Sequence, residues 1–160
     1  MQVSYTPGAN YSAKDARIAI VSARFNDKIV NAMHTAATNV LLENAVEAEN
    51  IVSKYVPGAF ELPVICKKLA ETNEFDGIIA LGCVIRGETP HFDYVCQGCT
   101  TGIQEVMLRT NIPVAFGVLT TNTLEQALAR SSSKDLENNK GHYSALCVLE
   151  MINELKSISL

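Results

Sequence analysis

Short apolar runs alternate along the chain with longer stretches in which apolar residues recur at helical spacing. Four of these runs, at residues 17–23, 51–56, 77–85 and 112–119, contain β-branched residues and are too short to form helices of their own. We therefore expect four strands. The run at residues 77–85 is almost continuously apolar, which is typical of a strand covered on both faces, so it should lie at the centre of the sheet.

Helical spacing follows each of the four runs. The first helix is expected to start at an N-cap, Asn26, and to end near Asn44. The second should extend over about residues 60–72. Pro63 must lie in its first turn, because only there does the missing N–H of proline leave no carbonyl group unpaired.

The second half of the chain continues the same alternation. Thr89 and Pro90 predict an N-cap and a first-turn residue for a long helix after the third run. Asn122 and Glu125 resemble a capping box for a short helix after the fourth run, and residues 143–155 have the spacing of a final amphipathic helix. The order is therefore strand then helix, repeated for each run, with an extra helix at the end.

This order predicts a single α/β domain over residues 1–160, in which residues 1–14 form a polar N-terminal arm. Strands that alternate with helices pair in parallel through right-handed crossovers. We expect a three-layer αβα sandwich, with a four-stranded parallel sheet and helices on both faces, as in flavodoxin-like proteins. In such sheets ligands bind beyond the carboxyl ends of the strands, so the strand-to-helix loops form the candidate site.

The composition excludes several classes of protein. Hydrophobic residues make up 48% and charged residues 19% of the chain, which is too apolar for a disordered segment and too interrupted by charge for a membrane span. The 13 basic and 17 acidic residues give a net charge of −4 without a basic cluster, which argues against nucleic acid as a partner. The polar start of the chain lacks a secretory signal, so we expect a cytoplasmic protein with no membrane partner.

The cysteines predict neither disulfides nor a redox centre. They number five, an odd count, in a chain large enough to fold without crosslinks, so we expect reduced thiols. Cys96 and Cys99 have the spacing of a redox pair, but both fall well inside a helix, away from the N-terminus that would lower a thiol pKa. No histidine and cysteine cluster has zinc-binding spacing, and no glycine-rich nucleotide motif follows a strand. We therefore expect no metal site.

The first two loops place an aromatic and a carboxylate side chain at helix starts. From its position alone, Phe25 is best explained as a hydrophobic staple that packs on Val30 of the following helix. Glu61 can complement the dipole of the second helix or bind the hydroxyl groups of a ligand. Both interpretations of Glu61 remain open at this point.

The third loop, residues 82–94, carries most of the candidate chemistry. Gly87 allows the backbone to approach a ligand, and the N–H groups near Glu88 and Thr89 belong to a helix N-terminus, which favours an anion such as phosphate. His91 lies in the first helical turn, where an imidazole can exchange protons near neutral pH. A lone histidine in a helix is more often structural, so position alone does not assign it a catalytic role.

Two arginines follow the third and fourth strands. Arg86 can be an ordinary solvated charge. Arg130, at the end of the short helix, can neutralise the helix C-terminus or bind phosphate through its guanidinium fork. Spacing alone decides neither role.

Taken together, these loops resemble the 6,7-dimethyl-8-ribityllumazine synthase family. The similarity extends from about residue 17 to residue 155, in the order and spacing of the family, and no single motif carries it. The matching segments are residues 24–26 (RFN), 56–63 (VPGAFELP), 82–95 (GCVIRGETPHFDYV), 116–121 (FGVLTT), 125–130 (EQALAR) and 139–141 (NKG).

The resemblance implies an enzyme of riboflavin biosynthesis. Members condense 5-amino-6-(D-ribitylamino)uracil with 3,4-dihydroxy-2-butanone 4-phosphate and release phosphate and water, without a metal or organic cofactor. Two small-molecule substrates are therefore the expected ligands. A flavin-binding or shell-forming module of the same fold, without catalysis, is the alternative.

The resemblance also implies a role for each candidate residue toward the pyrimidine substrate. Phe25 would stack on the ring, and Glu61 would accept hydrogen bonds from the ribityl hydroxyl groups. The backbone of Cys83 to Ile85 would bind the edge of the pyrimidine, with help from Lys140. The full pyrimidine and ribityl set is Phe25, Ala59, Phe60, Glu61, Cys83, Val84, Ile85 and Lys140.

For the phosphate substrate, the family pattern implies that Glu88 and Thr89 hold the phosphate at the helix N-terminus, paired with Arg130. His91 would move protons during imine formation, phosphate elimination and ring closure. In this family Phe116 and Arg130 complete a pocket that begins on the neighbouring subunit of a pentamer. We therefore expect a homopentamer with sites at the subunit interfaces.

The segment at residues 131–139 departs from the family pattern. Members that assemble into icosahedral shells carry a short glycine-rich link between the last two helices. Here the link lacks glycine and is longer. We expect a free pentamer or a pair of pentamers, with riboflavin synthase as a further partner that the resemblance suggests.

Overall fold

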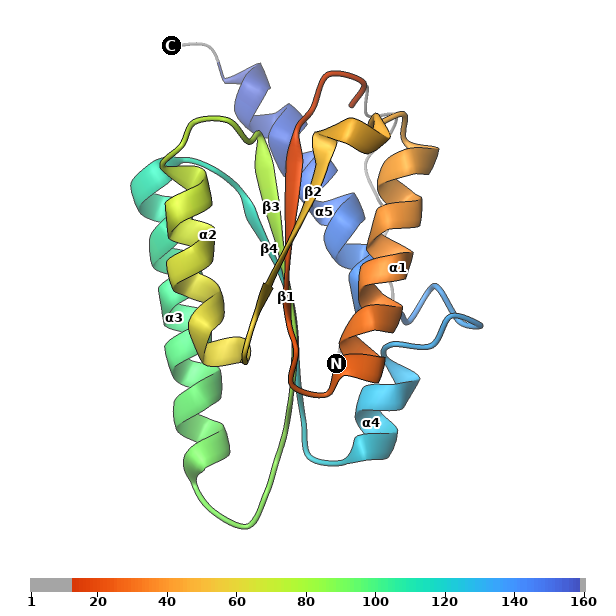
Figure 1. Ribbon diagram of the computed structural model, residues 1–160, viewed down its shortest axis with the longest axis vertical. Coiled ribbons are helices and arrows are strands. Elements are labelled where there is room, and N and C mark those ends of the chain that lie inside the picture. Colours follow the sequence, from red (N-terminus) through yellow and green to blue (C-terminus); the bar gives the residue numbers. More distant parts are fainter. Residues whose placement is uncertain (1–12, 159–160) are drawn as a thin grey trace.

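A parallel sheet forms the centre of the computed structural model, which describes residues 13–158 (Figure 1). Its strands are β1 (Ile18–Ala23), β2 (Ile51–Val56), β3 (Gly77–Ile85) and β4 (Val114–Thr121). The sheet has the order β2-β1-β3-β4, and every neighbouring pair is parallel. The polar arm predicted at residues 1–14 lies mostly outside the described residues.

Helices cover both faces of the sheet (Figure 1). One face is covered by α1 (Asp27–Glu43), α4 (Leu124–Ala129) and α5 (Lys140–Ser157). The other is covered by α2 (Leu62–Ala70) and α3 (His91–Thr110). Two short 3₁₀ turns, η1 (Ala48–Asn50) and η2 (Ala59–Glu61), precede β2 and α2. The predicted three-layer αβα sandwich is confirmed.

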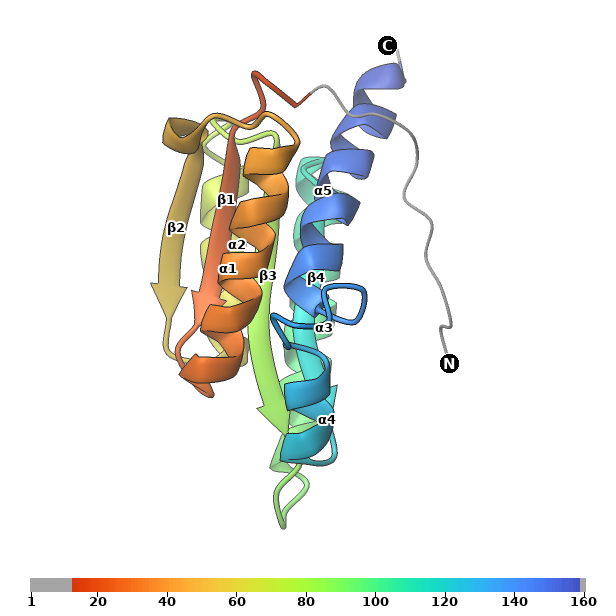
Figure 2. The same ribbon diagram turned by 90° about the vertical axis from the view of Figure 1, so that its right-hand side faces the viewer.

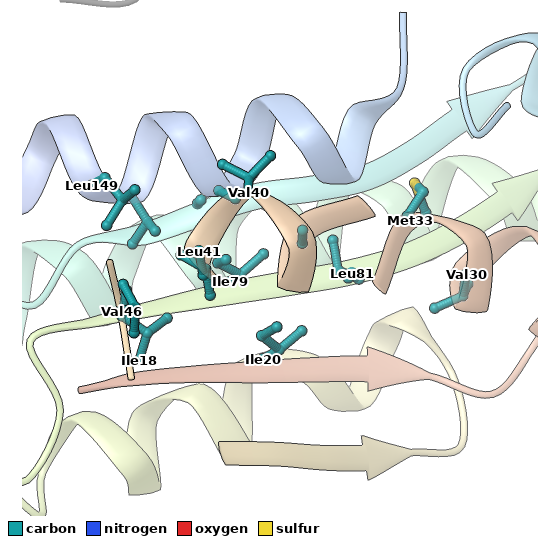
Figure 3. Close-up of a cluster of buried hydrophobic side chains, with 14 of the residues drawn as sticks. Ile18, Ile20, Val30, Met33, Val40, Leu41, Val46, Ile79, Leu81 and Leu149 are labelled. Atoms are coloured by element: carbon teal, nitrogen blue, oxygen red, sulfur yellow. The ribbon is translucent and has the colours of Figure 1, made fainter. Parts of the chain in front are cut away.

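The core consists of two apolar clusters, one on each face of the sheet. All of β1 is buried, and its successive side chains enter opposite clusters, as the pleat of a strand requires. Ile18 and Ile20 belong to the cluster on the side of α1 and α5, which also contains Leu41 and Leu149 (Figure 3). Ala19 belongs to the cluster formed with α2 and α3. Both β1 and β3 are therefore interior strands, whereas β2 and β4 form the edges.

Several predicted boundaries move because of contacts that are distant in sequence. Asn26 precedes α1 as expected, but its side chain makes no cap bond to the helix, and its backbone is left-handed with φ 58°. Its Nδ2 donates instead to the carbonyl oxygen of Cys83 at 2.8 Å. Similarly, α3 begins at His91 after Pro90, without a side-chain cap, so the N-cap role predicted for Thr89 is wrong.

The C-terminal elements shift by smaller steps. The fourth strand begins after Pro113, which has no N–H for the ladder, and continues to Thr121. The predicted capping box is displaced by one residue: Gln126 N donates to Thr123 Oγ1 at 3.2 Å, and Gln126 Oε1 accepts from Asn122 N at 2.8 Å. The last helix begins at Lys140, earlier than predicted. Its cap is Asn139, whose Oδ1 accepts from two backbone N–H groups of the first turn.

His34 of α1 lies half-buried against the edge strand β2. Its Nε2 lies 2.8 Å from Ser53 Oγ, and its ring stacks on that of Tyr55 with the centroids 6.2 Å apart. Burial lowers the pKa of His34 from its ordinary value of 6.5, because the charged imidazolium loses solvation there. The folded protein therefore favours neutral His34.

This contact predicts a pH-dependent stability. Because the unfolded chain binds the proton more readily, the contribution of neutral His34 is present above pH 6.5 and is lost as the pH falls through 6.5 toward the lower folded pKa. Urea unfolding between about pH 7 and pH 5.5 should show this as a decrease of less than about 1.4 kcal/mol per pH unit. His34→Gln, which can keep the Ser53 hydrogen bond, should show a smaller decrease in the free energy of unfolding over this pH range. If the free energy of unfolding depends on pH equally in both proteins, His34 is not the group responsible.

None of the helices within residues 13–158 combines the length and the apolar character needed to cross a membrane.

Candidate active site

The carboxyl ends of β1 and β3 form the switch point of the sheet, where the chain turns to opposite sides. The strand β1 pairs with β3 only as far as Ser22 with Leu81, while β3 continues to Ile85 along β4. The last part of β3 therefore has one unpaired edge facing the β1 side. Sheets of this kind bind ligands in the crevice at such a point.

Alternate residues of β3 direct their backbone groups to this crevice. Ile78 and Arg86 donate their N–H groups to the β4 side, to Pro113 O at 2.9 Å and Thr121 O at 2.9 Å. Since successive residues of a parallel strand bond to opposite neighbours, Cys83 and Ile85 face the crevice and Val84 faces β4.

The loops after β1 and β2 meet beside this crevice. Arg24 N donates to Val56 O at 2.8 Å and Phe25 N donates to Pro57 O at 3.1 Å. The Phe25 side chain is 74% exposed, so it does not serve as the staple on Val30 that its position suggested. A hollow of about 410 Å³ lies here, lined by Arg24, Phe25, Asn26 and Pro57. An exposed aromatic ring at the rim of a hollow is suited to stack on a planar ligand.

The start of α2 brings a carboxylate to the same place. Glu61 Oε2 accepts a hydrogen bond from Gly58 N at 2.9 Å, so part of its role is local capping. Within residues 13–158 its second carboxylate oxygen accepts no hydrogen bond. Ala59 is buried, whereas Phe60 is 60% exposed and lies over Gly98 of α3, where an added Cβ would come within 2.6 Å of the ring.

The loop between β3 and α3 is fully exposed and precedes an uncapped helix N-terminus. Glu88, Thr89 and His91 all lie at the surface there. No atom comes within 4 Å of the position that a Cβ of Gly87 would occupy. The free N–H groups of the first turn and the open space at Gly87 together suit an anion.

These residues form what we term the crevice group, which collects the candidates at the carboxyl ends of β1, β2 and β3. Its members are Phe25, Ala59, Phe60, Glu61, Cys83, Val84, Ile85, Glu88, Thr89 and His91.

The remaining candidates form a second set, the β4-side group, which consists of Phe116, Arg130 and Lys140. Phe116 is half-buried on β4, near the amino end of that strand. Arg130 follows α4 and is exposed, and its Nη1 donates to Gln126 O at 3.0 Å. Lys140 N donates to Arg130 O at 2.8 Å, which holds the backbones of these two residues side by side. The elements β4, α4 and α5 lie on the side of the molecule away from β2 (Figure 2).

Among the described residues, polar and ring contacts do not join the two groups, although Ala59, Val84 and Phe116 share one apolar cluster. Within residues 13–158, no hydrogen bond or ring contact links a side chain of the crevice group to one of the β4-side group. The crevice group offers stacking, a carboxylate, backbone polar groups and an imidazole, whereas the β4-side group offers two cations and an aromatic ring. A complete anion site therefore needs both groups.

Burial raises the pKa of each of the five thiols. All five cysteines are free, and burial raises the pKa of Cys66 and of Cys99 to about 12 in each case. A thiol with such a pKa is a poor nucleophile at neutral pH. Within the described part of the chain, no group of three or more histidine, cysteine or acidic side chains is placed to hold a metal ion.

Two contacts at the crevice were missed by the sequence interpretation. Asn26 was taken for a helix cap, but its side chain holds the end of β3 through Cys83. Arg86 pairs with Asp93 and with Asn122 of the next loop. The position of Asn26 directly after a central strand could have suggested the first contact. Nothing in the local spacing indicates the second.

Comparison with known proteins gives a consistent result. The profile of the family described as 6,7-dimethyl-8-ribityllumazine synthase matches residues 15–156. A curated protein of Lawsonia intracellularis (strain PHE/MN1-00), named 6,7-dimethyl-8-ribityllumazine synthase, is 47% identical over 150 residues, which cover 94% of each chain.

Proposed function

Because the chain belongs to the 6,7-dimethyl-8-ribityllumazine synthase family, we propose that it acts as a homopentamer whose active sites lie between neighbouring subunits. The chain is a transferase of riboflavin biosynthesis. It condenses 5-amino-6-(D-ribitylamino)uracil with 3,4-dihydroxy-2-butanone 4-phosphate to 6,7-dimethyl-8-ribityllumazine, with release of phosphate and water, in the penultimate step of the pathway.

The division of the candidate residues into two groups is the observation that supports a shared site. One subunit presents the uncapped start of α3 but has no cation of the β4-side group bonded to it. In a ring of identical subunits, each contact joins different surfaces of two neighbours, so the crevice group of one can meet the β4-side group of the next. The backbone bond between Arg130 and Lys140 supports a joint contribution of both residues to one site.

In this arrangement the crevice group holds the pyrimidine. Phe25 stacks on the ring, and the backbone groups of Cys83 and Ile85 bind its polar edge. Glu61 uses its second carboxylate oxygen for the ribityl hydroxyl groups, beside Ala59 and Phe60. Val84, whose backbone faces β4, contributes its half-buried side chain to the wall.

The phosphate substrate lies at the start of α3. Glu88 and Thr89 offer backbone N–H groups there, with the Glu88 carboxylate turned away, and Arg130 of the neighbouring subunit balances the negative charge. The 5-amino group of the pyrimidine attacks the single ketone carbon of the butanone and forms an imine with loss of water. The ribitylamino nitrogen closes the ring after phosphate has been eliminated, so the protein supplies no nucleophile. His91 transfers protons as water and phosphate leave. Phe116 of the neighbour closes the pocket.

We also propose that this single domain works in the cytoplasm, without cofactor, as a free pentamer or a pair of pentamers. The link at residues 131–139, which lacks glycine, supports the smaller assembly. Riboflavin synthase is the proposed protein partner.

Mixing two variants of low activity should restore part of the wild-type activity if the site is shared. Variants His91→Ala and Arg130→Ala, co-expressed in equal amounts, should form mixed pentamers in which about one quarter of the sites combine an intact crevice group with an intact β4-side group. The activity, measured by fluorescence of the lumazine product, should therefore reach about one quarter of the wild-type value.

The matched control mixes His91→Ala with Glu61→Ala, both of which alter the crevice group. Every site then contains one damaged residue, so this mixture should stay at the low activity of its parents, and light scattering should show the same assembly mass for both mixtures. If neither mixture recovers activity, each site lies within one subunit and the shared pocket is wrong. If wild-type protein forms no lumazine from the two substrates, the catalytic assignment itself fails.

A further inference from the structure

Arg86 closes the loop between β3 and α3 onto itself. Its guanidinium Nη2 and Nη1 donate to Asp93 Oδ1 at 2.8 Å and Oδ2 at 3.2 Å, which is a bidentate pair. The guanidinium also lies over the Phe92 ring, 4.2 Å from its centroid. The loop thus leaves β3 at Arg86 and returns to the same side chain in the first turn of α3.

The same side chain reaches the next loop of the sheet. Arg86 Nε donates to Asn122 Oδ1 at 3.1 Å, and its backbone N–H extends the ladder to Thr121 O at 2.9 Å. Asn122 in turn donates its N–H to Gln126 Oε1 at 2.8 Å, and the Gln126 carbonyl oxygen accepts from Arg130. One guanidinium therefore connects the loop before α3 with the helix that carries Arg130.

We propose that Arg86 is a positioning residue that holds residues 87–91 in the shape needed to receive the phosphate of the butanone substrate, an inference that rests on the proposed function. It acts through Asp93 and Asn122 and makes no contact with phosphate itself. Of its five N–H donors, three are engaged by these partners, and its charge is balanced by the carboxylate of Asp93.

The geometry requires arginine in this position. A planar fork with donors on three nitrogen atoms can bind a carboxylate with two and an amide oxygen with the third, whereas a lysine ammonium is a single point. The hydrogen bonds from Arg86 also hold the pKa of Asp93 below its ordinary value, so the pair keeps both charges at neutral pH. We call the hydrogen bonds from Arg86 to Asp93 and Asn122 the strap. The strap therefore remains closed under assay conditions.

The test compares Arg86→Met, Asp93→Asn and the double variant in the assembled protein. Each should raise KM for the butanone phosphate roughly ten-fold, and the double variant should be no worse than either single one, because all three remove the same strap. The dissociation constant of the pyrimidine should stay within about two-fold of the wild-type value, since the groups that bind it lie on β3 and on the loops after β1 and β2, outside residues 87–91. Arg86→Lys should resemble Arg86→Met.

Hydrogen exchange provides a readout that does not depend on turnover. The backbone amides of residues 86 and 93, which donate to Thr121 O and Pro90 O in the wild type, should exchange faster in Arg86→Met and Asp93→Asn, because the loop loses its closure. Arg17→Met is the matched control. Arg17 also pairs with a carboxylate, Glu74, at 4.0 Å and lies 5.1 Å from the centroid of the Phe75 ring, but at the opposite end of the sheet. It should change neither KM nor exchange in the loop.

Three results would overturn the strap. An Asp93→Asn variant with normal KM beside an impaired Arg86→Met would mean that Arg86 binds the substrate directly. Losses that multiply in the double variant would mean that the two side chains act separately. Unchanged exchange in both single variants would mean that the loop holds its shape without them. A wild-type protein that forms no lumazine would instead contradict the proposed function. The exchange data would still show whether Arg86 holds the shape of the loop.

Discussion

Replacing His91 by alanine is expected to lower kcat by about 10²-fold without abolishing turnover. The imidazole stands at the exposed start of α3, where water can take over part of the proton transfer. The larger part of the acceleration should come from holding two substrates together, which in the best intramolecular models supplies about 7–11 kcal/mol. Losing the proton carrier therefore removes only the smaller part.

The measurement is steady-state formation of the lumazine with both substrates at saturation, in wild type, His91→Ala and a control histidine variant, His34→Gln. His34 lies between α1 and β2, outside both candidate groups, so its replacement should leave kcat unchanged. A complete loss of turnover in His91→Ala, in protein that is assembled and binds both substrates, would show that positioning is not the main contribution. An unchanged kcat would remove His91 from the chemistry.

Replacing Gly141 by alanine is expected to destabilise the fold by about 3 kcal/mol or more. A Cβ at this position would lie 2.0 Å from Met33 O, 2.5 Å from its carbonyl carbon and 2.7 Å from its Cα. These are backbone atoms in the middle of α1, so no side-chain rotation can relieve the overlap. The first turn of α5 would have to move away from α1, and Lys140 and Arg130 would move with it.

Urea unfolding at fixed subunit concentration measures this effect, together with the yield of soluble protein. The matched control is Gly87→Ala. No atom lies within 4 Å of its added Cβ, and no glycine within residues 13–158 has positive φ, so its unfolding midpoint should equal that of wild type. Wild-type stability in Gly141→Ala would mean that the two helices are not held at this distance.

The strands could be predicted from the sequence because burial depends on runs of apolar residues. The bounds of β2 and β3 match the predicted runs. The start of β4 is displaced because Pro113 lacks the N–H that the ladder needs, and its end is extended by pairing with Val84 and Ile85. Helix starts were predicted less well. Local rules assign Asn26 to a cap, but the structure gives its amide a partner on β3, distant in sequence.

The candidate residues could be collected from the loops, but their arrangement could not. Whether Cys83 and Ile85 or Val84 faces the crevice depends on which neighbouring strand each residue of β3 bonds to, and how much of that edge is unpaired depends on where the pairing with β1 stops. No residue near these positions indicates either point. The Arg86 contacts combine a helix turn and a second loop, which no single window of sequence contains. Such features follow from the register of the strands and from the crossover connections, which bring together segments that are distant in sequence.

The hydrogen bond from Lys140 N to Arg130 O closes the segment between them into a loop with fixed ends. The ends stay 2.8 Å apart whatever length of chain runs between them, and lengthening a closed loop costs little free energy. Evolution can therefore lengthen, shorten or recompose this segment without moving either cation. The same property makes residues 133–137, which are all exposed, a suitable place to insert a peptide tag or a foreign epitope.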